Sequence, residues 1–129
     1  MKFDRALVFV NGILFIGFGL GFILAPVFFF ALFTGGEFTT SSAIIDARAT
    51  YGGLALGLGI WLVICSKQDV RLGLLGSFVV LAAVIVGRIT GVALDGGANL
   101  FMYLFLAAEV LFFLATWYAF RLGKKRSTF

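Results

Sequence analysis

The sequence predicts an all-α fold, an integral membrane four-helix bundle with both termini on the cytoplasmic side. Three observations lead to this prediction. The 129 residues are 62% hydrophobic and only 12% charged, far from the composition of ordinary soluble domains. The apolar residues form four runs long enough to cross a hydrocarbon core about 30 Å thick. Eight of the ten basic residues stand at the two termini or in one short loop.

The first expected span covers residues 6–25. Pro26 has no backbone N–H and should end or kink this helix. Residues 27–33 are too few to span again, so they either continue a kinked helix or lie in the interface. One stripe at helical spacing contains Val8, Asn11, Phe15, Phe18 and Phe22. Beside it, Gly17 and Gly21 should form a strip that another backbone can approach closely.

The other expected spans cover residues 43–65, 70–94 and 100–120. With the first span they form one four-helix transmembrane domain, residues 1–129. The second span opens with the sequence Asp46-Ala47-Arg48-Ala49-Thr50-Tyr51-Gly52-Gly53. Arg48, Gly52, Ala55 and Gly59 share one helical face, so the arginine heads a strip of small residues suited to tight packing.

The basic residues are distributed unevenly between the predicted loops. They form three groups: Lys2 and Arg5; Lys67 and Arg71; and Arg121, Lys124, Lys125 and Arg126. The opposite loops carry Glu37 and Asp95, with Asp46 at their border, and no lysine or arginine. Because lysine and arginine are enriched in cytoplasmic loops, both termini are expected in the cytoplasm.

Three charged residues lie furthest inside the predicted spans. With a rise of about 1.5 Å per residue, Arg48 lies about 6 Å, Arg88 about 8 Å and Glu109 about 14 Å below the outer helix ends. Since charges at this depth need partners, Glu109 is expected to pair with Arg88 or Arg48. Asp46, Asp95 and Tyr51 complete a candidate polar recess in the outer half of the bilayer.

This recess has two interpretations, and the residues leave both open. In the first interpretation it is a binding site, because two arginines against one deep carboxylate leave a surplus positive charge. The guanidinium fork matches carboxylate or phosphate oxygens, so the ligand would be an acidic or carbonyl-bearing amphiphile such as a lipid or quinone. Alternatively, the recess is a structural ion-pair network that fixes helix register.

Several function classes are disfavoured by what the sequence lacks. It contains no histidine and one cysteine, Cys65, which removes the usual ligands of zinc, haem and iron–sulfur clusters. No serine stands beside a plausible activator, and no phosphate-cradling loop is present. We therefore expect no catalytic residue, no metal, no cofactor and no enzymatic activity. The basic residues follow membrane topology, so no nucleic-acid partner is expected either.

Three polar segments of the sequence also resemble those of a known family. The segment Asp46 to Gly53, the segment Gly87-Arg88-Ile89-Thr90-Gly91 with Asp95-Gly96, and Glu109 resemble the domain-of-unknown-function 4345 family of small bacterial membrane proteins. The resemblance covers nearly the whole chain and implies a four-helix bundle. It implies that the polar residues of that bundle are Arg48, Tyr51, Gly53, Arg88, Asp95 and Glu109. It supplies no activity.

The leading hypothesis is a non-catalytic protein of the bacterial inner membrane whose polar recess binds an amphiphile. Its expected partners are membrane lipids, this ligand, and further copies or a larger membrane complex. In the alternative hypothesis, the chain is an accessory structural subunit of that complex, and the ion pair is structural. A minimal transporter is a third alternative, supported only by the echo of Arg48-Ala49-Thr50 in Arg88-Ile89-Thr90.

Overall fold

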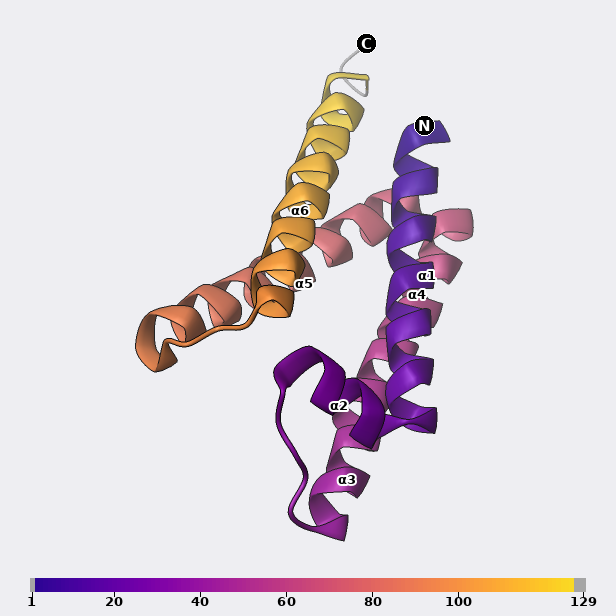
Figure 1. The fold of residues 1–129 in the computed structure, drawn as a ribbon. Helices are drawn as coiled ribbons and strands as arrows, with labels where there is room; N and C mark the ends of the chain where they lie inside the picture. The colour runs from indigo at the N-terminus through magenta and orange to yellow at the C-terminus, as the bar shows by residue number, and fades with distance from the viewer. Residues whose placement is uncertain (1, 127–129) are drawn as a thin grey trace.

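The computed structural model describes residues 2–126, with side chains for residues 2–123. Within this range the chain is almost entirely helical and has no β-strand. Four helical stretches are long and apolar enough to cross a membrane, which confirms the predicted all-α membrane fold. Figure 1 shows α1 and α4 side by side, whereas the last turns of α5 project away from them and α6 runs toward the end of the molecule where α1 begins.

The first span is α1 (Lys2–Leu24), and Pro26 ends it as predicted. The backbone turns at Ala25 (φ −137°, ψ 61°), and α2 (Pro26–Thr34) starts with the proline in its first turn. Residues 27–33 therefore belong to a separate short helix. This helix turns back against α1, with the Phe29 and Phe33 rings beside Phe22. A left-handed Gly35 (φ 72°) closes α2.

The second span is one continuous helix built from three segments, α3 (Ser41–Ala47), the π-helical η1 (Arg48–Leu54) and α4 (Ala55–Gln68). It begins at Ser41, two residues before the predicted start, because the Thr40 hydroxyl accepts a hydrogen bond from the Ala43 N–H at 3.2 Å. That contact satisfies one of the free donors at a helix start. The π-helical segment was not predicted.

The last two spans are α5 (Val70–Asp95) and α6 (Leu100–Arg126). The Asp69 carboxylate accepts from the Leu72 N–H at 3.0 Å and starts α5. Two consecutive glycines with positive φ, Gly96 and Gly97, end that helix. At the other end of the loop, the Asn99 side chain accepts from the Met102 N–H at 3.1 Å and starts α6.

Glycines bring α1 into backbone contact with the second span. A Cβ atom on Gly19 would lie 2.5 Å from the Leu56 nitrogen, and one on Gly59 would lie 2.6 Å from the Gly12 oxygen. The predicted small-residue face of the second span is thus used. On α1, however, the prediction of Gly17 and Gly21 was wrong. Gly17 faces open space, and Gly21 faces the Phe29 ring because α2 turns back over it.

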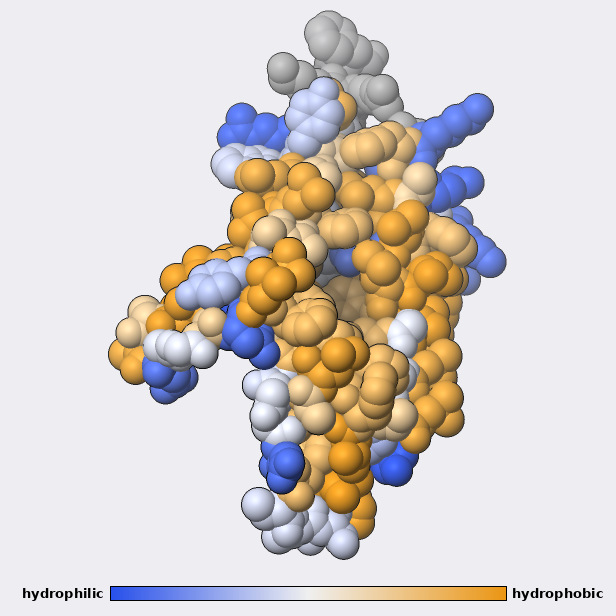
Figure 2. Space-filling view, viewed as in Figure 1, coloured by the Kyte–Doolittle hydropathy of each residue, from blue (hydrophilic) through white to orange (hydrophobic). Residues whose placement is uncertain are grey.

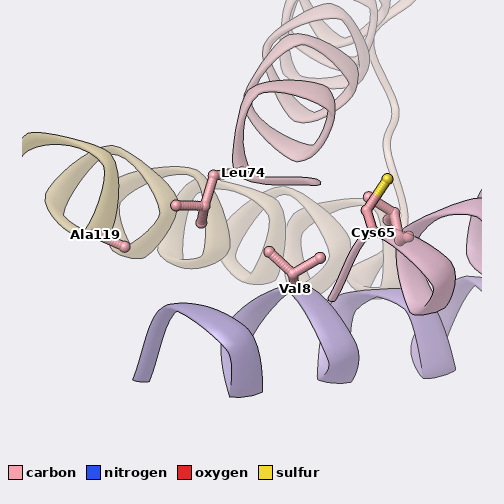
Figure 3. Packing of buried hydrophobic residues seen from close by; sticks show 5 residues of the cluster. Val8, Cys65, Leu74 and Ala119 are labelled. Carbon is pink, nitrogen blue, oxygen red and sulfur yellow. The ribbon is translucent and has the colours of Figure 1, made fainter. Parts of the chain in front are cut away.

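The main buried cluster is small and takes its residues from the start of α1, the end of α4, the start of α5 and the end of α6. Figure 3 shows Val8 of α1 pointing between Leu74 and Cys65, with Ala119 of α6 close by. These residues and Leu62 form one buried cluster. The start of α1, the α4–α5 connection and the end of α6 therefore meet at the same end of the bundle.

Most large apolar side chains lie outside this core. Figure 2 shows a broad hydrophobic surface, with hydrophilic residues gathered mainly toward the ends and loops. Of the most apolar stretch of α6, only 6% is buried within the chain, compared with 28% for α1. Such a surface fits a hydrocarbon environment, in which apolar side chains need no protein cover.

Candidate functional site

Arg88 of α5 and Glu109 of α6 form a two-pronged ion pair. Arg88 Nε donates to Glu109 Oε2 at 2.8 Å, and Arg88 Nη2 donates to Glu109 Oε1 at 2.6 Å. Both carboxylate oxygens are therefore engaged by one guanidinium group. This planar arrangement is the strongest contact available to an arginine and a carboxylate. The two side chains are 20% and 16% exposed, so the pair is largely withdrawn from the surface.

Two further contacts surround the same guanidinium group. Arg88 Nη1 donates toward the Met102 sulfur at 3.4 Å, and Arg88 Cζ lies 5.4 Å from the centre of the Phe105 ring. Both partners stand on the first turns of α6. The donors of the Arg88 guanidinium group and one of its faces thus contact residues of α6, the helix that carries Glu109. The pair is neutral and joins α5 to α6.

Arg48 has different partners. Its Nη1 donates to the carbonyl oxygen of Ile23 and lies 3.5 Å from that of Leu24. Helix ends leave their last carbonyls without intrahelical donors, and here Pro26 removes one further donor. The Gly21 carbonyl is satisfied by the Ala25 N–H at 2.8 Å. The guanidinium group therefore caps the end of α1, where the helix dipole also favours a cation.

The segment that carries Arg48 is π-helical over Arg48–Leu54. A π-helical turn widens the helix locally and is frequent at functional sites. Tyr51 lies in this segment, 49% exposed, with its ring 5.3 Å from that of Phe22. Just before it, the Asp46 carboxylate accepts from the Thr50 hydroxyl at 3.4 Å. The polar side chains of this region thus lie at an irregular part of the span.

Aromatic rings lie between the two arginines. The Tyr51 ring contacts Phe22, the Phe22 ring contacts Phe33 at 6.3 Å, and Phe33 contacts Phe105 at 5.0 Å. Phe105 in turn faces Arg88. We call Phe22, Phe33 and Phe105 the aromatic bridge. It links Tyr51, in the segment that carries Arg48, to Arg88 through packed rings.

The six predicted recess residues do not form one cluster. Arg88 and Glu109 contact each other, whereas Arg48, Tyr51 and Asp46 lie on the α3–η1 side. Asp95 is exposed at the end of α5. Of the two partners left open for Glu109 by the sequence, the structure selects Arg88. Within the described residues, Arg48 makes no ion pair.

Sequence reasoning missed several groups that build this region. The carbonyls of Ile23 and Leu24 are backbone atoms, yet Pro26, which stops the helix soon after them, was a signal that they would be free. The sequence suggested Asn99 only as a residue that could line the recess; its amide donates to the Phe33 carbonyl at 2.8 Å and attaches α2 to the start of α6. The side-chain pattern of residues 48–54 did not predict the π-helical turn.

The arrangement offers cationic hydrogen-bond donors and an aromatic surface. Across the described part of the chain, no three histidine, cysteine, aspartate or glutamate side chains gather closely enough to hold a metal ion. The exposed remainder of the Arg48 guanidinium group is the element of this region that can accept a new anionic or carbonyl partner.

Comparison with known proteins adds the family. A family model described as "Domain of unknown function (DUF4345)" matches residues 3–120. No curated protein and no solved structure matches the chain. The match covers all four spans, including both arginines and Glu109. The chain is therefore a multi-pass membrane protein that belongs to the DUF4345 family.

Proposed function

We propose that this chain is a non-catalytic protein of the bacterial inner membrane that binds an amphiphile with an acidic or carbonyl-bearing headgroup. The headgroup contacts Arg48, and the apolar part lies against the aromatic bridge. Arg88 and Glu109 hold α5 and α6 in place beside it. Both termini face the cytoplasm, in keeping with the uneven distribution of basic residues, so the Arg48 region lies in the outer half of the bilayer.

The observation that carries this proposal is the contrast in charge compensation. Glu109 is fully used by Arg88, while Arg48 contacts only carbonyl oxygens among the described residues. A carbonyl cap lowers the cost of placing the cation there but does not neutralise it. Because an uncompensated arginine within a span is costly, an anionic or strongly polar headgroup would stabilise it. The surplus positive charge expected from the sequence thus resides on Arg48.

Tyr51 and the neighbouring rings support an amphiphilic ligand over a small ion. The tyrosine is half exposed, and its ring is tilted against Phe22 and lies 6.5 Å from Phe30. Rings beside a cationic donor provide apolar area and one fixed polar contact, the usual composition of sites for organic ligands. The proposal is limited to binding, because the hydrogen bonds of Arg48 are to backbone carbonyls.

The test is a binding titration on purified protein in detergent. The probes are oleate, for a carboxylate headgroup, and a short-chain ubiquinone, for a carbonyl headgroup. Arg48→Gln should weaken one of them about tenfold or more, because hydrogen bonds to a charged group are worth roughly 1.5–3 kcal/mol. Arg71→Gln is the matched control, since Arg71 lies at the opposite end of the bundle and faces the Phe120 ring.

Unaltered circular dichroism and gel filtration of Arg48→Gln would establish that the variant is folded. If it then binds both probes as the wild type does, or if neither probe binds the wild type, the proposal is wrong. A loss of equal size in Arg71→Gln would also contradict it, because the effect would then reflect net charge.

A second candidate function is that of an accessory subunit. It is favoured by apolar and small residues that stay exposed on α4, α5 and α6. α6 has the least buried apolar stretch of the four spans. A Cβ atom added to Gly57 or Gly87 would meet nothing within 4 Å, so these small residues stay accessible to another helix. Affinity purification in mild detergent decides between the two: a stoichiometric companion protein supports the subunit, and a lone monomer excludes it.

A further inference from the structure

A second feature lies at the other end of the bundle, where the start of α1, the end of α6 and the α4–α5 connection meet. The start of α1 and the end of α4 enclose a groove of about 420 Å³. Its lining comprises Lys2, Arg5, Ala6, Phe9, Ser66 and Lys67. The volume falls within the roughly 300–1,000 Å³ of typical ligand sites. We propose that this groove binds the phosphate headgroup of an anionic phospholipid.

The lining follows from helical periodicity. Lys2, Arg5, Ala6 and Phe9 are separated by three or four residues and therefore share one face of α1. Asp4 falls on the opposite face and is buried, with 7% exposure. The single acidic residue of this helix start is thus turned away from the groove. The face that borders the groove presents only cations and apolar groups.

The three cations of the groove come from two different helices. Lys2 and Arg5 stand on the first turn of α1, and Lys67 stands on the last turn of α4. All three are exposed, and none of them makes an ion pair or hydrogen bond with another described residue. Ser66 is already occupied, since its hydroxyl donates to the Val63 carbonyl at 2.7 Å. Three such cations around one opening attract an anion with more than one oxygen, as phosphate has.

The floor of the groove distinguishes a lipid from a free anion. Ala6 and Phe9 are apolar, and Phe9 is 41% exposed. Below Phe9 on the same face of α1 comes Ile13, and below Lys67 on α4 comes Ile64, which are 47% and 46% exposed. An acyl chain that leaves the groove toward the membrane interior would therefore run along exposed isoleucines on both helices. A soluble phosphate would gain nothing from this apolar path.

This site is separate from the Arg48 region in position and in leaflet. Charge attraction at a membrane surface is worth about 1 kcal/mol per lysine or arginine, so removal of two groove cations should weaken lipid binding by roughly tenfold or more. The test titrates the purified protein with dioleoyl phosphatidylglycerol and dioleoyl phosphatidylcholine and counts bound lipids by native mass spectrometry. The groove variant is Arg5→Gln/Lys67→Gln.

The matched control is Arg71→Gln/Arg121→Gln. It removes two cations from the same end of the bundle that lie over the Phe120 and Trp117 rings and outside the groove. Weaker phosphatidylglycerol binding in the groove variant alone, with no change for phosphatidylcholine, is the expected result. Equal losses in both double variants would overturn the proposal, because the attraction would then belong to the basic end as a whole.

Two further arms of the experiment test whether the ligand is a lipid and whether it binds in the groove. Glycerol 3-phosphate, added in excess, should not displace the lipid; if it displaces the lipid and binds the groove variant more weakly, the site takes a free phosphate and the lipid assignment is wrong. The whole comparison is repeated in an Arg48→Gln background. The groove effect should persist there at full size, and its disappearance would mean that the lipid binds at Arg48.

Discussion

The two helix pairs of this protein are held together by different means. α1 and the second span approach at glycines, so that their backbones touch and the Arg48 side chain reaches across to the end of α1. α5 and α6 are held by side chains, among them the Arg88–Glu109 pair and the stacked rings of Phe78 and Phe113. Backbone contact fixes the first pair, and a neutral ion pair fixes the second.

The two arginines correspondingly have different kinds of partner. The backbone carbonyls at the end of α1 supply the oxygens that Arg48 contacts, and the Glu109 carboxylate supplies those that Arg88 contacts. In the function proposed above, Arg88 is a structural residue and Arg48 receives the ligand. Each of these statements can be tested by substitution.

The largest effect is expected at the ion pair. Glu109→Gln leaves Arg88 partly buried without a counter-charge, which should cost about 2–4 kcal/mol, slightly discounted from a fully buried pair. The measurement is thermal or denaturant unfolding in detergent. Arg88→Met/Glu109→Met is the control, since it removes both charges and should recover much of the loss. If the single and double variants lose the same stability, the pair is not what joins α5 to α6.

A somewhat smaller effect is expected at the glycine contacts. Gly19→Ala places a methyl group 2.5 Å from the Leu56 nitrogen and 2.6 Å from the Gly52 oxygen. Backbone atoms cannot move aside cheaply, so the cost should be about 1–3 kcal/mol. Gly17→Ala, two residues away on the same helix, faces open space and should be neutral or slightly stabilising. Equal effects of the two changes on unfolding would show that α1 and the second span do not touch.

The role of Arg48 as a helix cap can be isolated with Pro26. Arg48→Gln should lose about 1–2 kcal/mol, because a charge-assisted hydrogen bond to a carbonyl disappears. Pro26→Ala restores an N–H for the Phe22 carbonyl and removes the ring that stops α1. If α1 then continues, the N–H groups of Val27 and Phe28 can reach the Ile23 and Leu24 carbonyls. Arg48→Gln should therefore cost less in the Pro26→Ala background, and unfolding of the four proteins measures this coupling. If the losses of unfolding free energy in the two single variants simply add in the double variant, Arg48 does not cap the end of α1 that Pro26 creates.

Much of this architecture could be predicted from the sequence because it depends on composition and spacing. Long apolar runs define the spans, Pro26 ends α1, and Gly52 and Gly59 mark a contact face. The partner of Glu109 could only be narrowed to two arginines. Which one is chosen depends on how far apart two helices stand, and that distance is set by side chains on neighbouring spans that no local pattern specifies.

The backbone features could not be predicted for a related reason. A π-helical turn at residues 48–54 differs from an α-helix by one residue per turn, and the apolar pattern there is too short to distinguish the two. Likewise, Gly12 and Gly19 contact the second span, whereas Gly21 is covered by α2, which turns back over α1. That turn direction follows from tertiary contacts such as Phe22 with Phe29.

The smallest loss of stability is expected at the start of the second span. The same substitution tests whether the π-helical segment depends on the N-terminal cap or on the contact with α1. Thr40→Ala removes the hydroxyl that accepts from the Ala43 N–H, which should cost about 0.5–1 kcal/mol. Thr39→Ala is the control, since Thr40 and not Thr39 occupies the cap position. If the segment is held by α1 through Arg48 and Gly52, amide exchange in Thr40→Ala should speed up at residues 41–45 and stay unchanged at residues 50–54. Faster exchange throughout both ranges would mean that the π-helical turn depends on its N-terminal cap, and that the contact with α1 does not fix it.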